Sequence, residues 1–239
     1  MSKHQKRISA PRSWPIQRKE HYWTVNPIPG AHPARHSIPL LLIIRDLLDL
    51  ADNTKEAKRV LHEGNILVNG KERKDYRFPV GIFDIISIPK IEKHYRVLTD
   101  KKGKLTFTEI KEEDSKTKLC RINNKTIIKS GKVQLNLHDG RNIIGSNELK
   151  TKDSVIVSIP ENKIIEKYAF SEGNHAMVIG GKHSGEVGKI ESIKEIRSSS
   201  PNMVIISQDD QKIETIEDYV FVVGEDKLEI DLEGTGISA

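Results

Sequence analysis

The chain has 239 residues, of which 36% are hydrophobic and 31% charged, as expected of a folded but polar protein of one or two small domains. Its longest apolar run, residues 38–44, includes a proline and falls far short of the ~20 residues of a membrane span. The polar, basic opening does not match a secretory signal. A single cysteine, Cys120, excludes an internal disulfide and a cysteine-rich zinc module. We therefore expect an intracellular protein without metal or cofactor.

Charge is distributed unevenly along the chain. Residues 1–40 hold seven Lys and Arg and one acid, whereas residues 201–239 hold two Lys and ten acids, although the whole chain carries only +5. This asymmetry predicts that the N-terminal portion meets a polyanion. For so small a net charge, ordinary solvated surface is the alternative. The acidic end is expected to face solvent or basic protein neighbours.

Residues 1–39 are interpreted as an extended basic arm, because their prolines leave no helical or alternating apolar period. Alone, such a segment cannot bury enough surface to fold. Both tryptophans, Trp14 and Trp23, lie here among cations, and RNA-binding arms combine phosphate neutralisation with base stacking. The alternative is that the two rings pack on the protein's own core. A zinc site at His32 and His36 lacks further ligands. The candidate RNA-binding residues of the arm are Lys3, Lys6, Arg7, Arg12, Trp14, Arg18 and Lys19.

Residues 40–100 predict two helices followed by a β-hairpin. The apolar run from Leu40 predicts a well-packed helix that ends near Asn53. Thr54 is predicted to cap the N-terminus of the second helix, and Gly64 to end that helix. Asn69-Gly70 is the dipeptide favoured in two-residue hairpin turns. Further extended stretches are expected at residues 78–80 and 85–88.

This order of elements resembles the small RNA-binding module first named for a bacterial small-subunit ribosomal protein, the "S-four" domain. In that family the second helix and the hairpin loop form one basic surface against structured RNA. A solvated surface cation is the alternative at each position. The resemblance implies RNA contacts by Arg45, Lys55, Lys58, Arg59, Lys71, Arg73 and Lys74.

Residues 101–170 predict a small β-rich domain. Gly103, Gly131, Asp139-Gly140 and Asn162 punctuate its β-favouring runs at turn positions. Lysines are concentrated in the turns, where either solvation or phosphate contact accounts for them. The runs expected to form strands here and just before are residues 95–98, 105–108, 125–128, 133–137 and 155–159.

The glycine-rich stretch at residues 173–193 does not fit a nucleotide-binding phosphate loop, because Lys189 is followed by Ile190 instead of Ser or Thr. Its spacing of glycines and apolar pairs resembles a KOW motif, which occurs in small SH3-like β-barrels of ribosomal proteins and transcription elongation factors. A purely structural barrel turn is the alternative. The resemblance implies loops that contact RNA or protein through Lys182, His183 and Lys189.

The opening His4-x-Lys6-Arg7-Ile8-Ser9-x-Pro11-x-x-Trp14-x-Ile16 resembles the start of the S-four-e family of small-subunit ribosomal proteins, in its archaeal form. The resemblance implies an α+β, multi-module fold: an extended arm at 1–39, an ααββ-type "S-four" RNA-binding module at 40–100, a central small β domain at 101–170 and a C-terminal KOW/SH3-like β-barrel at 171–239. Low net charge is unusual for such a protein.

The same resemblance implies a function without catalysis. The protein is expected in the cytoplasm, on the ribosome, where it binds small-subunit ribosomal RNA, helps that RNA fold during assembly and contacts neighbouring small-subunit ribosomal proteins. We expect no membrane and no DNA partner. The arm is expected to thread between RNA helices and to become ordered only there.

Two other classes of function stay open. An RNA-modifying enzyme that carries an S-four module needs a catalytic domain, yet residues 101–239 offer no nucleophile or acid–base pair in a recognisable constellation. A transcription elongation or antitermination factor built around a KOW barrel requires neither the basic aromatic arm nor the helix–hairpin module.

Overall fold

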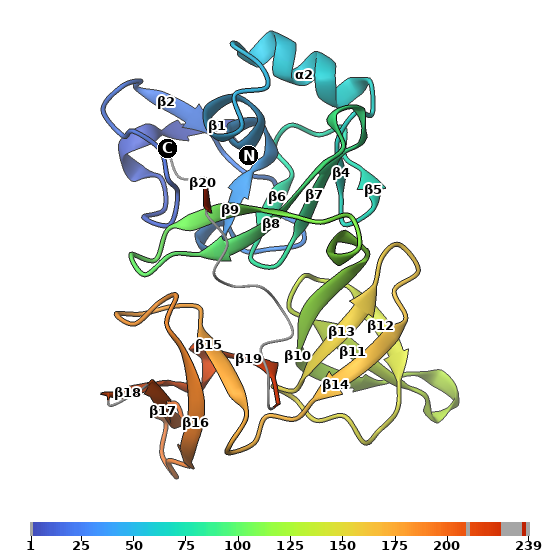
Figure 1. The fold of residues 1–239 in the computed structure, drawn as a ribbon, viewed down its shortest axis with the longest axis vertical. Helices are drawn as coiled ribbons and strands as arrows, with labels where there is room; N and C mark the ends of the chain where they lie inside the picture. The colour runs from blue at the N-terminus through green and yellow to red at the C-terminus, as the bar shows by residue number, and fades with distance from the viewer. Residues whose placement is uncertain (1, 209–210, 226–235, 238–239) are drawn as a thin grey trace.

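A computed structural model describes residues 2–208, 211–225 and 236–237 (Figure 1). The fold is mixed, with mostly strands and few helices, and its sheets are antiparallel. The arm and a six-stranded sheet fill the upper half of Figure 1, and two five-stranded sheets lie side by side below them. Among these residues, no helix combines the length and apolar character that a membrane crossing requires.

The six-stranded sheet, called here the first sheet, has the strand order β20-β9-β8-β7-β4-β5. The runs predicted at 95–98 and 105–108 lie within β8 and β9. Because β9 pairs with β8 along its length, residues 105–110 extend this sheet beyond the boundary expected at residue 100. The strands are β4 (Leu67–Val68), β5 (Lys71–Glu72), β7 (Ile85–Ile88), β8 (Lys93–Thr99), β9 (Leu105–Ile110) and β20 (Gly236–Ile237).

The first helix is shorter than predicted. It comprises α1 (Leu40–Leu42) and a π-helical turn at Ile43–Leu47, and the backbone then turns at Asp49, where φ is 51°. The prediction that it extends to Asn53 is therefore wrong. Residues 40–44 are completely buried, so this segment has no exposed polar stripe from which its end could be read.

The second helix, α2 (Thr54–His62), begins one residue earlier than predicted. Asn53 caps its N-terminus, because the Asn53 Oδ1 accepts hydrogen bonds from the backbone N–H groups of Lys55 (2.9 Å) and Glu56 (3.0 Å). Thr54 is thus the first helical residue, and its prediction as the cap is wrong. Gly64 follows the last turn with a φ of 74°, in agreement with its predicted role at the helix end.

The arm is folded against the rest of the protein. Strand β1 (His4–Lys6) pairs with β2 (Trp23–Val25), and β3 (Ser37–Pro39) pairs with β6 (Pro79–Gly81). Trp14 is only 1% exposed and joins the core beneath the first sheet, where its Nε1–H donates to the carbonyl of Ser37 at 2.6 Å. The expectation that the arm becomes ordered only on RNA is therefore wrong: its prolines exclude regular helix but not packing.

The other two sheets follow in chain order. The predicted turn residues Gly103, Gly131, Gly140 and Asn162 all have positive φ. The strands β12 (Asn142–Gly145) and β14 (Ile164–Tyr168) were not predicted, because most of their residues are at least partly exposed. The central sheet has the order β12-β11-β10-β13-β14, with β10 (Thr117–Ile127), β11 (Val133–Leu137), β12 (Asn142–Gly145), β13 (Ser154–Ser158) and β14 (Ile164–Tyr168). The last sheet has the order β18-β17-β16-β15-β19, with β15 (His175–Val178), β16 (Val187–Lys194), β17 (Met203–Gln208), β18 (Gln211–Ile216) and β19 (Val220–Gly224).

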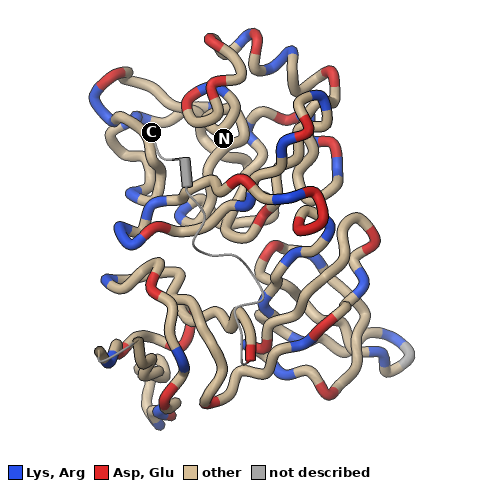
Figure 2. Tube along the Cα trace, viewed as in Figure 1, with Lys and Arg blue, Asp and Glu red and all other residues tan. Residues whose placement is uncertain are grey.

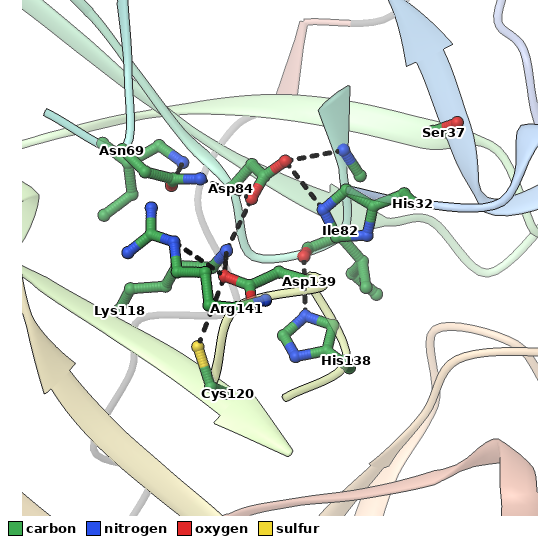
Figure 3. Close-up of polar contacts among 12 residues, drawn as sticks. His32, Ser37, Asn69, Ile82, Asp84, Lys118, Cys120, His138, Asp139 and Arg141 are labelled. Atoms are coloured by element: carbon green, nitrogen blue, oxygen red, sulfur yellow. Dashed lines mark hydrogen bonds and ion pairs between the residues drawn. The ribbon is translucent and has the colours of Figure 1, made fainter. Parts of the chain in front are cut away.

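A buried ionic network joins the first sheet to the central sheet (Figure 3). The Lys118 side chain, on β10, is completely buried, and its Nζ donates to Asp84 Oδ1 at 2.6 Å and to Asp139 Oδ2 at 2.7 Å. Asp84 lies in the turn before β7 and also accepts hydrogen bonds from the Asn69 side chain (2.8 Å) and the Gly81 backbone N–H (2.9 Å). One ammonium group therefore ties together two separately built sheets.

The charges of this network stabilise one another. Burial alone would raise the pKa of Asp84 and of Asp139, but the Lys118 ammonium lowers both pKa values below their ordinary range. Burial alone would lower the pKa of Lys118, yet the two carboxylates raise it. Beside them, burial raises the pKa of the Cys120 thiol to about 12, so this cysteine is unreactive at neutral pH.

Two neighbouring polar and aromatic contacts, among others, join the last sheet to the central sheet. The Arg121 Nη1 donates to the carbonyls of Asp218 (2.7 Å) and Val220 (3.0 Å). The His138 ring lies edge-on to Phe221, with 5.1 Å between ring centroids, and its Nδ1 accepts the Arg121 backbone N–H. Burial, followed by the Lys118 charge, lowers the pKa of His138 to about 3, so the ring is neutral at physiological pH.

Replacing the central cation tests the network. Lys118→Met leaves two buried carboxylates without their counter-charge, and we expect the free energy of unfolding in urea to fall by about 3–5 kcal/mol. Neutralising the acids as well, in Lys118→Met with Asp84→Asn and Asp139→Asn, should recover part of that loss. Lys163→Met is the control, since it breaks only a solvent-exposed pair with Glu161 and should leave the free energy of unfolding almost unchanged. Equal losses at Lys118 and Lys163 would contradict this account.

The neutral histidine predicts a pH dependence of stability. Between about pH 6.5 and pH 3, unfolded chains bind a proton at His138 that the folded protein does not, so stability falls as pH decreases. The buried carboxylates contribute only near and below about pH 4, so urea unfolding between pH 7 and pH 5 reports on the histidines, and comparison with a His138 variant isolates this one. His138→Gln should flatten this dependence by up to about 1.4 kcal/mol per pH unit. His36, whose pKa is also lowered, is unchanged in both proteins. An identical pH slope in the variant would refute the assignment.

Candidate nucleic-acid interface

One face of α2 carries exposed cations because its opposite face is held in the core. Ala57 and Leu61 are completely buried, which turns Lys55 and Arg59 toward solvent. Lys58 is half-buried, with its Nζ 4.2 Å from the centroid of the Tyr76 ring. Arg59 also pairs with Glu63, although its side chain is largely exposed. The helix thus presents cations to solvent, where a bound anion can contact them.

The hairpin beside α2 adds cations to the same module. Asn69 and Gly70 have φ values of 51° and 71°, which confirms the predicted two-residue turn between β4 and β5. A Cβ atom at Gly70 would lie 2.5 Å from Cγ2 of Ile159, so glycine permits the central sheet to approach the turn. Lys71 and Lys74 follow the turn and are exposed.

Two candidates of this module have protein partners instead. Arg45 is ion-paired with the adjacent Asp46, and its Nη1 donates to Thr54 Oγ1 at 3.0 Å. Arg73 is half-buried, with its guanidinium carbon 4.4 Å from the Phe78 ring centroid, and burial lowers its pKa. In this structure both arginines hold the module together, so neither is freely available to a phosphate.

Three candidates of the arm make contacts within the protein itself. The Arg7 side chain is buried, where it pairs with Glu20 at 3.3 Å and its Nε donates to the Gln17 carbonyl. Arg18 donates to three carbonyls of the arm itself. With the buried Trp14, they build the arm. The burial of Arg7 and Trp14 contradicts their prediction as RNA contacts, whereas RNA contact by the half-buried Arg18 stays a prediction. The arm candidates that remain exposed are Lys3, Lys6, Arg12 and Lys19.

The arm has an exposed aromatic surface that the predicted site residues did not include, although Trp23 was considered above as a stacking ring. Tyr22 is 64% and Trp23 52% exposed, and their rings meet edge-on with centroids 4.9 Å apart. The His4 ring contacts Trp23 in the same way, and Lys6 Nζ lies 5.7 Å from the Tyr22 ring centroid. Alternation along β2 was the available signal, because Thr24 is buried and Trp23 beside it points outward. We refer to Tyr22, Trp23 and His4 as the aromatic cluster.

The glycine-rich segment of the last sheet presents a third set of candidates. Lys182 and Lys189 are exposed, whereas His183 is half-buried, with its Nδ1 3.0 Å from a Glu186 carboxylate oxygen. His32, considered above for zinc, has its Nε2 2.9 Å from Asp84. Within the described ranges, no group of three or more His, Cys, Asp or Glu side chains is arranged to hold a metal ion.

Basic and acidic residues are interspersed over the part of the chain that the structure describes, as Figure 2 shows. We therefore define the candidate interface by local clusters of cations and not by a single charged face. Part of the predicted acidic end, including the acids at 226–233, lies outside the described residues.

The two tryptophans are predicted to respond differently to substitution. Trp14→Ala removes a core side chain and should lower the free energy of unfolding by about 3–5 kcal/mol. Trp23→Ala removes an exposed ring and should change stability by no more than about 0.5 kcal/mol. In filter binding to small-subunit ribosomal RNA, Trp23→Ala should weaken affinity by about 1–3 kcal/mol, the contribution of one stacked base. Unchanged RNA affinity in Trp23→Ala would remove the aromatic cluster from the interface.

Comparison with known proteins places the chain in a family. Residues 1–35 match the RS4NT (NUC023) domain, and residues 91–164 match Ribosomal family S4e. The chain is 52% identical to small ribosomal subunit protein eS4 of Archaeoglobus fulgidus over 96% of this chain and 97% of the relative, and 45% identical to that of Methanocaldococcus jannaschii over 96% and 97%. The crystal structure of 30S ribosomal protein S4e from Thermoplasma acidophilum, 34% identical, covers 80% of this chain and 96% of its own, with a TM-score of 0.69. The chain therefore belongs to the S4e family of ribosomal proteins, as the opening motif predicted, and its relatives support the archaeal form.

Proposed function

We propose that this chain is a structural constituent of the small ribosomal subunit, where it binds the ribosomal RNA and supports its folding and assembly for translation. The observation that carries the proposal is its similarity to small ribosomal subunit protein eS4 along nearly the whole of both chains. Its place would be on the ribosome in the cytoplasm, with the small-subunit RNA and neighbouring ribosomal proteins as partners. A transcription factor and an RNA-modifying enzyme are not favoured, because the relatives are ribosomal proteins.

The finer assignment of modules is part of this proposal. We assign RNA binding in residues 40–100 to an S-four-like surface of α2 and the β4–β5 hairpin, supported by exposed Lys55, Arg59, Lys71 and Lys74. Residues 171–239 would serve as a KOW-type barrel. Residues 111–170, which follow β9, would serve as the central β domain between the two. Cations on separate modules would contact phosphates and set the protein's orientation on the RNA.

The mechanism we propose is electrostatic docking combined with recognition of RNA shape. Lys and Arg side chains neutralise phosphates and release counterions, and the aromatic cluster stacks on unpaired bases. The network around Lys118 holds the first and central sheets together, so cations on these sheets meet the RNA in a fixed relative geometry.

Sedimentation of cell lysate tests the proposed function. The chain, followed by mass spectrometry on a sucrose gradient, should sediment with the small ribosomal subunit and leave that fraction after nuclease treatment. The variant Lys55→Ala, Lys58→Ala, Arg59→Ala should dissociate at lower salt than the wild type, since each lost phosphate contact reduces the salt slope of binding by about 0.7–0.9.

The control for the variant is Lys163→Ala with Lys167→Ala, which removes exposed cations of the central sheet that are paired with acids. Release of both variants at the same salt would take α2 out of the interface. A wild-type chain that stays in light fractions, or that sediments with RNA polymerase, would refute the ribosomal function itself.

A further inference from the structure

We propose that a basic cleft between the arm, the β8–β9 turn and the β15–β16 loop binds the sugar–phosphate backbone of RNA. This inference rests on the proposed function and adds a contact site to it. We call this site the junction cleft and define it by Arg12, Arg35, His36, Lys102, Gly180 and Gly181, which line it. Its volume is about 300 Å³.

The residues of the junction cleft come from three distant parts of the sequence. The two arm segments are joined by a hydrogen bond from the Ser13 hydroxyl to the Arg35 carbonyl at 3.0 Å. The β8–β9 turn and the β15–β16 loop also approach closely, because a Cβ atom at Gly185 would lie 2.6 Å from the Asp100 carbonyl carbon. The protein's own packing therefore sets the positions of the elements that carry the cations.

The cations of this cleft are not neutralised. Arg12, Arg35 and Lys102 are exposed, no acidic residue lines the cleft, and their side chains make no hydrogen bond or ion pair with any other residue that the structure describes. Arg7 and Arg45, by contrast, each have a carboxylate partner. Unpaired like charges around one concavity raise the local positive potential and favour an anion there.

The glycines supply a second kind of donor. The backbone N–H groups of Gly180 and Gly181 donate no hydrogen bond to another described residue. Gly181 has a φ of 82°, a conformation that glycine adopts without strain. Backbone amides without side chains in front of them can approach a phosphate oxygen closely, as they do in other anion-binding loops.

The lining selects the backbone of RNA over its bases. Phe, Tyr and Trp are absent from the lining residues, and the one ring among them is the small imidazole of His36, so the cleft lacks a large stacking platform for bases. Three separated cations with amide donors fit successive phosphodiesters of one strand, which carry charge but no sequence information. The site would therefore fix the position of the protein on RNA across the first and last sheets.

The test compares two variants of the full chain with equal charge loss. The cleft variant is Arg12→Gln, Arg35→Gln, Lys102→Gln, and the matched control is Lys125→Gln, Lys163→Gln, Lys167→Gln on the central sheet. Binding to small-subunit ribosomal RNA is measured between about 50 and 200 mM salt. If each cation contacts one phosphate, the slope of log affinity against log salt should decrease by about 2–3 in the cleft variant and stay unchanged in the control.

The possible outcomes distinguish a failure of the junction cleft from a failure of the proposed function. A wild-type protein that does not bind this RNA contradicts the proposed function and, with it, the cleft. Wild-type binding with the same slope in the cleft variant and in the control overturns the cleft alone.

A tethered probe gives a direct reading of what enters the cleft. Lys101→Cys, beside Lys102, allows selective attachment of iron–EDTA because Cys120 is completely buried. Hydroxyl radicals should then cut one short RNA region, and the cleft substitutions should abolish that cut. An undiminished cut in the cleft variant would overturn the proposal. The proposal would also be overturned if polyglutamate, but not RNA, protected the introduced cysteine from labelling, because that result would identify an acidic protein partner.

Discussion

The relative placement of the sheets depends on one buried ammonium group. Lys118 leaves water entirely, which is unfavourable unless its partners are arranged around it, and Asp84 and Asp139 meet it from two different sheets. A hydrophobic contact of the same volume could give equal stability while tolerating several arrangements. An ion cluster tolerates few, because a displaced carboxylate would lie buried without a partner. We interpret the network as a device that specifies one assembly of the modules.

This specification matters for a protein that meets a folded polyanion. The cations of α2, of the hairpin and of the junction cleft lie on different elements of the fold. In the proposed interface each alone would contribute only weak, salt-sensitive binding. Their combined selectivity comes from the spacing between them, which must match the spacing of phosphates on the RNA. The bonds of Arg121 to the carbonyls of Asp218 and Val220 extend the same constraint to the last sheet. Low net charge is compatible with this, because a few correctly placed cations suffice.

Local chemistry made some elements predictable and others not. Asn69-Gly70 and Gly64 were identified because their backbone conformations favour those residue types. The end of the first helix was misjudged because residues 40–44 are buried on every side, which removes the periodicity that marks a surface helix. The junction cleft could not be predicted, since its cations are distant in sequence. The same holds for the pair of His32 and Asp84, and sequence patterns carry no information on which distant residues meet.

The burial of Trp14 has a consequence for how the chain folds during its synthesis. The core that receives this ring includes residues as late as Phe107, and the Leu105 backbone N–H donates to the Ser13 carbonyl. At about 5–20 residues per second, roughly 5–20 seconds separate the synthesis of the ring from that of the last strand of its core. During that interval the arm is a nascent, basic, aromatic segment without its partners. The part of the chain made first thus waits for the last strand of its core, and until then nothing in the protein shields its cations from the RNA around it.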